Sequence, residues 1–380
     1  MRRALRLACC ALVLAGCDEA GRREETAGAS GSAPSRPADD CGQAVSPIVD
    51  GFGAPGPHAV ARTSFDTPGW PGQRVSVFLP RGAKGPRPVV ALVHANGVDD
   101  PVHYRALVAH VVSRGHAVVF PTYMLDGDDL PKRYDAIEAG LLEALRRHPD
   151  RLDTSRIGFV GHSFGAGALP WLAHRALVER GLGERGAFLF AMAPWYALRV
   201  TPEDLGALPG HLAVLILVFE DDRVTDHRIA IELFHAIGVP EDRKDYLAVR
   251  SDREGGCALA ARHTVPQSTG LAARDDALDA HAVFRLFDAL AAFAFEGDEA
   301  GRRTALGHGS EAQVAMGHWR SGRPVLPLLW RERPEPLRAP DRYLFAHRDA
   351  AQWRGEGGAG AQTGGPHPAR VSPRGAGPGP

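Results

Sequence analysis

The chain lacks the features that identify several classes of protein. Its 380 residues contain no C-x-x-C or H-E-x-x-H pattern, so neither common type of zinc site is expected. Lysine and arginine number 44 and aspartate and glutamate 45, which gives a net charge of −1. This balance provides no electrostatic reason to expect nucleic acid as a partner. We find no internal repeat, and we expect neither a metal nor another cofactor.

Long hydrophobic runs are also missing at the N-terminus. Three of the first six residues are arginine, and the apolar segment at 5–14 is too short for a membrane-spanning helix. Leu14-Ala15-Gly16-Cys17 then resembles the lipobox of bacterial lipoproteins. The resemblance implies that residues 1–16 are a signal peptide and that Cys17 is lipidated. The protein would then be anchored to a membrane of the bacterial cell envelope. An ordinary secretory signal with an incidental cysteine is the alternative.

Cysteine itself is scarce. Of five cysteines, Cys9 and Cys10 would leave with the signal peptide and Cys17 would carry lipid. Only Cys41 and Cys257 remain, and an exported protein is in a compartment where such a pair can form a disulfide. Spacing alone leaves two free thiols open as the alternative.

Composition divides the remaining chain into four parts. Residues 17–45 are rich in glycine, alanine, serine, glutamate and proline and have no periodicity, which indicates a flexible tether. Residues 46–297 carry the regular patterns of a folded domain. Residues 298–346 are expected to form an extension packed on that domain, with a strand pair turning at Ser321-Gly322. The glycine-rich tail at 347–380 is predicted to be disordered.

Within the domain, apolar strands alternate with amphipathic helices. Such alternation predicts an α/β fold with a mostly parallel, doubly wound sheet and helices on both faces. In this arrangement the functional site lies at the carboxyl ends of the strands. The strands are expected at 74–80, 88–94, 117–121, 157–160, 187–193, 212–219 and 245–250, and the helices at 104–113, 135–148, 165–179, 226–237 and about 275–295.

The most informative motif is Gly161-His162-Ser163-Phe164-Gly165, which has the form G-x-S-x-G. A glycine-rich chain can contain this pattern by chance in a simple loop. Here, however, an apolar strand precedes the motif and a helical pattern follows it. That context is typical of a nucleophile elbow, in which a tight strand-to-helix turn exposes the serine hydroxyl. We therefore expect Ser163 to be a nucleophile.

The elbow and its setting resemble the α/β-hydrolase superfamily over roughly residues 57–297. Within it, the chain is similar to dienelactone hydrolases, platelet-activating-factor acetylhydrolases and bacterial polyester cutinases. Three short segments carry this narrower resemblance: 56–60 (G-P-H-A-V), 161–167 (G-H-S-F-G-A-G) and 193–195 (A-P-W). The short segment at 195–211 leaves no room for a large lid domain.

A serine nucleophile needs a general base and an acid that orients the base. In this superfamily they follow the serine in the order acid, then histidine. The loop after the strand at 212–219 resembles the family's G-x-x-D loop, with Phe219 in place of the glycine. That register assigns Asp222 as the acid. Asp221 is the main alternative, Glu220 and Asp226 are further ones, and one of these acids is expected to cap the next helix.

His263 is the first histidine after the strand at 245–250, and we expect it to be the base. His281 falls inside a helical pattern, while His308 and His318 follow the last helix, so their positions suit the role less well. A lone histidine is often only a surface or core residue, and position in the chain is what distinguishes His263.

The resemblance also implies donors for an oxyanion and a substrate contact. The backbone N–H of Phe164 should be one donor. The segment His94-Ala95-Asn96-Gly97 resembles the family's H-G-x-x loop, with Ala95 in place of glycine, and assigns the N–H of Asn96 as the second. A plain Asn-Gly turn is compatible with this role. Trp195 matches a residue that lines the acyl site in the family, although it could also merely pack over a loop.

These features predict a monomeric serine hydrolase that cleaves small or polymeric carboxylic esters without a cofactor. The catalytic residues would be Ser163, His263 and Asp222. An acyltransferase or peptidase with the same triad is an alternative function. A binding protein of the cell envelope that keeps the fold without catalysis is another.

Overall fold

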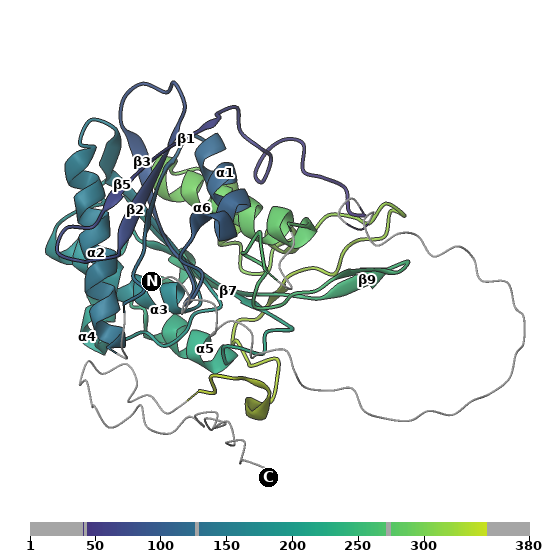
Figure 1. Cartoon of the computed structure of the whole chain (residues 1–380). Helices are drawn as coiled ribbons and strands as arrows, with labels where there is room; N and C mark the ends of the chain where they lie inside the picture. The colour runs from purple at the N-terminus through teal and green to yellow at the C-terminus, as the bar shows by residue number, and fades with distance from the viewer. Residues whose placement is uncertain (1–40, 42–43, 126–128, 271–274, 348–380) are drawn as a thin grey trace, which may run out of the picture.

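The structure is a computed structural model that describes residues 41, 44–125, 129–270 and 275–347 (Figure 1). The expected signal peptide, the expected lipidation site Cys17, most of the expected tether and all but the first residue of the tail lie outside the described residues. In the described ranges, no helix combines the length and apolarity needed to cross a bilayer.

A nine-stranded sheet forms the centre of the molecule, with the strand order β1-β2-β4-β3-β5-β6-β7-β8-β11. The strands from β4 to β8 run parallel, whereas β1, β2 and β11 pair antiparallel at the edges. The central strands are continuous apolar runs because helices cover both of their faces. Their bounds are β1 (Val60–Asp66), β2 (Arg74–Pro80), β3 (Arg87–Val93), β4 (Ala117–Pro121), β5 (Leu152–His162), β6 (Gly186–Met192), β7 (Ala213–Phe219), β8 (Lys244–Val249) and β11 (Leu329–Trp330).

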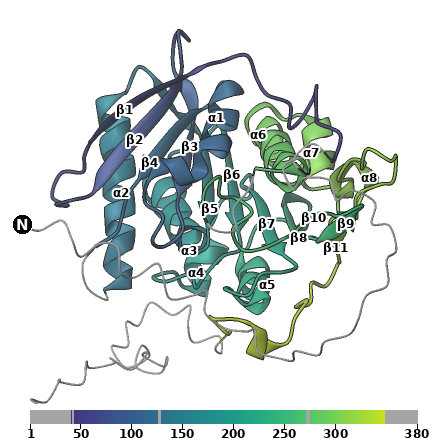
Figure 2. The ribbon, with the colours of Figure 1, turned by 45° about the vertical axis from the view of Figure 1, so that its right-hand side comes forward.

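Helices pack on the two faces of the sheet and give two separate apolar cores (Figure 2). One core includes α2 (Leu130–Arg147), α3 (Phe164–Ala173), α4 (Pro202–Gly206) and α5 (His227–Ala236). The other includes α1 (Arg105–Ser113), α6 (Arg285–Glu296) and α7 (Glu299–Ala305). The protein is therefore a mixed α/β protein with a large, mostly parallel sheet flanked by helices, as the alternating patterns predicted.

Shorter elements complete the fold. A two-stranded hairpin, β9 (Asp252–Glu254) and β10 (Cys257–Leu259), follows β8. Two π-helical segments are continuous with longer helices: η3 (His174–Glu179) continues α3, and η5 (Asp279–Phe284) leads into α6. The remaining elements are short single turns: η2 (Pro101–Tyr104), η4 (Glu241–Arg243), α8 (Glu311–Val314) and η6 (Pro340–Arg342).

Several element boundaries differ from the sequence prediction. Helix α2 begins at Leu130, before the expected 135, because the Asp129 side chain accepts a hydrogen bond from the Lys132 N–H and caps an earlier first turn. The described 298–346 region contains α7, α8 and β11, where only a strand pair was expected. At Ser321-Gly322 the chain does turn, but the flanking residues form only an isolated bridge.

The C-terminal extension is attached to the sheet by a buried carboxylate on β8. Asp245 accepts hydrogen bonds from the Gln313 side chain at 2.6 Å, the Trp330 indole at 2.7 Å and the His308 N–H at 3.0 Å. Since a buried carboxylate is unfavourable without such partners, these donors make the docking of the extension specific.

The N-terminal segment is attached by a disulfide. Cys41 and Cys257 are bonded, with an S–S distance of 2.11 Å, which joins the end of the expected tether to the β9–β10 hairpin. Val45 is buried and forms a bridge with Trp319. The last residues of the 17–45 segment are thus held against the folded domain.

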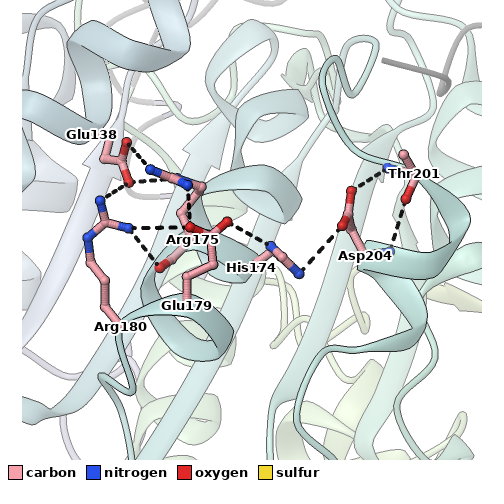
Figure 3. Close-up of polar contacts among 7 residues, drawn as sticks. All are labelled: Glu138, His174, Arg175, Glu179, Arg180, Thr201 and Asp204. Atoms are coloured by element: carbon pink, nitrogen blue, oxygen red, sulfur yellow. Dashed lines mark hydrogen bonds and ion pairs between the residues drawn. The ribbon is translucent and has the colours of Figure 1, made fainter. Parts of the chain in front are cut away.

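The segment at 195–211, where a lid could be inserted, contains only the short helix α4. Polar contacts fasten α4 to its neighbours (Figure 3). The His174 side chain reaches Asp204 of α4 at 3.5 Å, and Arg180 pairs with Glu138 of α2 at 2.9 Å in the same cluster. The cluster thus connects the middle of α2, the π-helical segment η3 that continues α3, and α4.

Candidate active site

Ser163 occupies the turn between β5 and α3. Its φ of +56° and ψ of −120° lie outside the regions that residues other than glycine normally adopt. Such a conformation is strained by about 1–3 kcal/mol and persists only where the surroundings enforce it. The Ser163 N–H donates to the Met192 carbonyl at 2.9 Å, and the Ser163 carbonyl accepts from the Trp195 N–H at 3.0 Å. The end of β6 and the residues that follow it therefore hold the turn.

The two glycines of the motif are steric requirements of this turn. A Cβ on Gly165 would lie 2.2 Å from the carbonyl oxygen of Val93, and one on Gly161 would lie 2.8 Å from the N atom of Ala166. Neither distance is possible for a real side chain, so α3 can start directly against the end of β3 only with glycine at these positions. The motif thus has the conformation of a nucleophile elbow.

Asp222 and His263 are hydrogen-bonded although 41 residues separate them. Asp222 lies in the loop after β7, and His263 follows the β9–β10 hairpin. The Nδ1–H of His263 donates to Asp222 Oδ2 at 2.8 Å. The carboxylate is fully buried and also accepts hydrogen bonds from the Val224 N–H at 2.6 Å and the Thr225 hydroxyl at 3.0 Å. Its orientation toward His263 is therefore fixed.

These contacts keep Asp222 ionised. Burial opposes the charged form, but the positive charge that His263 can carry and the hydrogen bonds from His263 and Val224 outweigh it. The pKa of Asp222 consequently lies below its ordinary value. A buried anion that faces Nδ1 keeps the proton on that nitrogen, so Nε2 of His263 is free to act as a base.

The alternative acids in this loop contact other groups. The Asp221 carboxylate accepts from the Ser251 hydroxyl at 2.6 Å and pairs with Arg338. Glu220 accepts from the Ser251 N–H at 2.8 Å. Asp226 caps α5, as one acid of the loop was expected to do. Among these acids, Asp222 is the one whose hydrogen bond reaches His263.

The other candidate histidines lie in different surroundings. His281 bonds the carbonyl of Ser46 at 3.3 Å, and His308 bonds Asp245 at 3.1 Å. The backbone of His318 pairs in the short bridge of the extension. Among the described residues, these contacts attach peripheral segments and do not involve the carboxylate of Asp222.

The second expected oxyanion donor lies in a turn at the end of β3. The Val98 N–H bonds the Ala95 carbonyl at 3.4 Å, and Gly97 has a φ of +82°, so residues 95–98 form a turn. The Asn96 side chain is exposed and accepts from Arg133 at 2.8 Å. The Asn-Gly turn that the sequence suggested is therefore present, and it is compatible with a backbone N–H of Asn96 that is available to a ligand.

The amides of Asn96 and Phe164 belong to neighbouring parts of the fold. Strands β3 and β5 are adjacent and parallel, with Val93 opposite Gly161. The Phe164 N–H starts α3, and N–H groups in the first turn of a helix have no partner within the helix. Within the described residues, neither amide has a protein acceptor. Such free amides beside Ser163 could bind an oxyanion.

Trp195 lies beside the elbow. Its backbone N–H donates to the Ser163 carbonyl. The centroid of its ring lies 5.5 Å from that of Phe164 and 5.6 Å from that of Phe345. The indole nitrogen is buried, and in the part of the chain that the structure describes it has no hydrogen-bond partner. An indole N–H of this kind can donate to a bound molecule.

Some residues of the site carried no signal in the sequence. The C-terminal strap, residues 343–347, runs along the loop that bears Asp222: the Leu344 and Phe345 N–H groups donate to the carbonyls of Arg223 and Val224, both at 2.8 Å. A second example is the buried hydrogen bond between Tyr104 Oη and His162 Nδ1, beside the elbow. His162 occupies a variable position of G-x-S-x-G, and no local pattern indicated Tyr104.

No group of three metal-ligating side chains occurs in the described residues. No protein family model matches the chain, and a search of the curated proteins finds no match either. The function must therefore be inferred from the site itself.

Proposed function

We propose that the protein is a serine hydrolase with the α/β-hydrolase fold, and that it cleaves carboxylic esters. One observation carries this proposal: a buried carboxylate, Asp222, bonds His263 at 2.8 Å, at the same edge of the sheet as the strained Ser163 turn. The three residues follow β5, β7 and the β9–β10 hairpin in the order serine, acid, histidine.

The proposed reaction has two halves. Nε2 of His263 removes the hydroxyl proton of Ser163 while Oγ attacks the ester carbonyl carbon. The amides of Asn96 and Phe164 donate to the oxyanion that develops on the carbonyl oxygen. His263 then gives its proton to the departing alkoxide, which leaves an acyl-enzyme. A water molecule, deprotonated by His263, attacks the acyl carbon and releases the acid.

The direct test is labelling with a fluorophosphonate, which reacts with activated serines. The wild-type protein should be labelled at Ser163, and Ser163→Ala should not. Ser321→Ala, which removes an exposed turn serine, is the matched control and should label like the wild type. The proposal fails if the wild-type protein is folded yet remains unlabelled.

Hydrolysis can be separated from acyl transfer to another acceptor. The release of p-nitrophenol from an ester should not accelerate when an alcohol or amine acceptor is added. Esters of increasing acyl length, with a polyester film alongside, would define the substrate. We propose that Trp195 contacts the acyl group, and the short 195–211 segment supports access of bulky esters.

We further propose that the mature protein is attached to a membrane of the cell envelope through lipid on Cys17. The disulfide between Cys41 and Cys257 supports export, since such bonds persist in oxidising compartments. Cys17→Ser should move the protein from the membrane fraction to the soluble fraction of the envelope. The unchanged appearance of Cys17→Ser in the membrane fraction would contradict the lipid anchor.

A further inference from the structure

A chain of buried hydrogen bonds runs behind the catalytic residues. The Ala95 N–H donates to Tyr104 Oη at 2.9 Å, Tyr104 Oη lies 3.0 Å from His162 Nδ1, and His162 Nε2 lies 2.8 Å from the His263 carbonyl. The side chains of Tyr104 and His162 are both fully buried. We call this chain the Tyr104–His162 relay.

The chemistry of the end groups gives the relay one direction. A carbonyl only accepts, so Nε2 of His162 carries a proton and donates it to His263. In a neutral imidazole, Nδ1 is then an acceptor, and the Tyr104 hydroxyl donates to it. Burial above all, and also the nearby charge of His263, lower the pKa of His162 well below 6.5, which keeps the ring neutral. Every group in the relay thus has a partner of matching polarity.

The relay connects three segments that the proposed reaction needs. Ala95 directly precedes the oxyanion donor Asn96, and His162 directly precedes Ser163. The third segment is the loop that contains His263, whose backbone carbonyl accepts the hydrogen bond from His162 Nε2. The Ala95 N–H, in the loop after β3, points inward and donates to Tyr104. The next backbone N–H along the chain, that of Asn96, is left without this partner.

We propose that Tyr104 and His162 are positioning residues that set the geometry between the oxyanion amide of Asn96, the nucleophile and the base. The inference rests on the proposed function. Neither side chain touches the reacting atoms by this account; each acts through the backbone of a neighbour. Because proximity effects decline steeply with displacement, a shift of about 1 Å at these loops can slow the reaction on the order of 10²-fold.

The variants follow from the polarity of the relay. Tyr104→Phe removes one hydroxyl and leaves the Ala95 N–H and His162 Nδ1 without partners. His162→Leu removes both nitrogens, whereas His162→Gln keeps a donor for the His263 carbonyl and should restore part of the rate. Tyr246→Phe is the matched control, because Tyr246 is also buried but its hydroxyl has no partner in the described residues.

Rates are best expressed per active site, counted by fluorophosphonate titration, so that loss of folded protein does not imitate a positioning effect. We expect kcat per titrated site to fall about 10- to 100-fold for Tyr104→Phe and His162→Leu, with KM nearly unchanged. The double variant should lose about as much as the worse single variant, since both break one connection. Tyr246→Phe should keep the wild-type rate.

Two results would overturn the relay. One is a kcat per site for both Tyr104→Phe and His162→Leu within about twofold of the wild type. The other is unchanged amide hydrogen exchange at Ala95 in Tyr104→Phe, which does not depend on turnover. If instead the wild-type protein neither labels nor hydrolyses esters, the proposed function fails, and the exchange at Ala95 still decides whether Tyr104 holds this loop.

Discussion

Replacement of Asp222 by asparagine tests the proposed mechanism at one atom. In the structure, Oδ1 of Asp222 accepts from the Val224 and Thr225 amides, at 2.6 and 3.2 Å, while Oδ2 accepts from His263 Nδ1 at 2.8 Å. An asparagine in this place keeps its oxygen toward the two amides. Its NH₂ group then faces His263, which can bond it only if Nδ1 carries no proton.

The consequence is the wrong tautomer of His263. The proton moves to Nε2, the nitrogen that must accept the proton of Ser163. A change of this kind in a serine–histidine–aspartate triad lowers kcat by about 10⁴-fold, or roughly 5.5 kcal/mol in activation free energy. The fold should be retained, because Asp222→Asn preserves the size of the side chain and the two amide contacts.

Asp221→Asn is the matched control, one residue away. Its carboxylate is partly exposed and contacts Ser251 and Arg338, so loss of its charge should alter kcat by less than about threefold. Initial rates with a short p-nitrophenyl ester, together with circular dichroism of both variants, measure the difference. A large loss in Asp221→Asn with little loss in Asp222→Asn would refute the assignment of the acid.

Three further predictions concern stability. Ser163→Gly should be about 1 kcal/mol more stable than Ser163→Ala in urea, because glycine tolerates a φ of +56°; equal stabilities would show that the turn is not strained. Replacement of both Cys41 and Cys257 by serine should lower the free energy of unfolding by about 2–5 kcal/mol, and an unchanged urea midpoint would contradict this. Burial lowers the pKa of His94 from 6.5 to about 4 and lowers that of His162 as well. Below pH 6.5 the unfolded chain therefore binds protons that the folded protein does not. Between pH 6.5 and about 4, His94 should destabilise the fold by about 1.4 kcal/mol per pH unit, and His162 should act in the same direction. Urea midpoints that are equal at pH 7.5 and pH 5 would count against that reasoning.

The central part of the fold could be predicted because its signal is local. The residues of β7 form an uninterrupted apolar run, as a strand covered on both faces must, and helical patterns separate such runs. The elbow was predictable for the same reason, since the two glycines that its tight turn requires are adjacent in the sequence to the serine.

The edges of the sheet were not predictable in this way. Strand β1 is only half-buried and β11 has only two residues. Neither strand therefore shows a clear alternation of apolar and polar residues. The extension is held by Asp245, whose partners Gln313 and Trp330 are 68 and 85 residues away. Polar contacts over such separations leave no periodic pattern, because any surface segment can contain a glutamine or a tryptophan.

The choice between Asp221 and Asp222 shows how distant residues complete the site. Both acids follow the same strand, and the sequence alone favoured Asp222 only by resemblance. In the structure, Ser251 and Arg338 bind the Asp221 carboxylate from outside, while the Val224 and Thr225 amides turn Asp222 inward. Arg338 belongs to the C-terminal extension, for which the sequence indicated only packing against the core. Through this contact the extension binds the acid loop on its outer side, so loss of the Arg338 guanidinium should disturb this loop more than the surface around it.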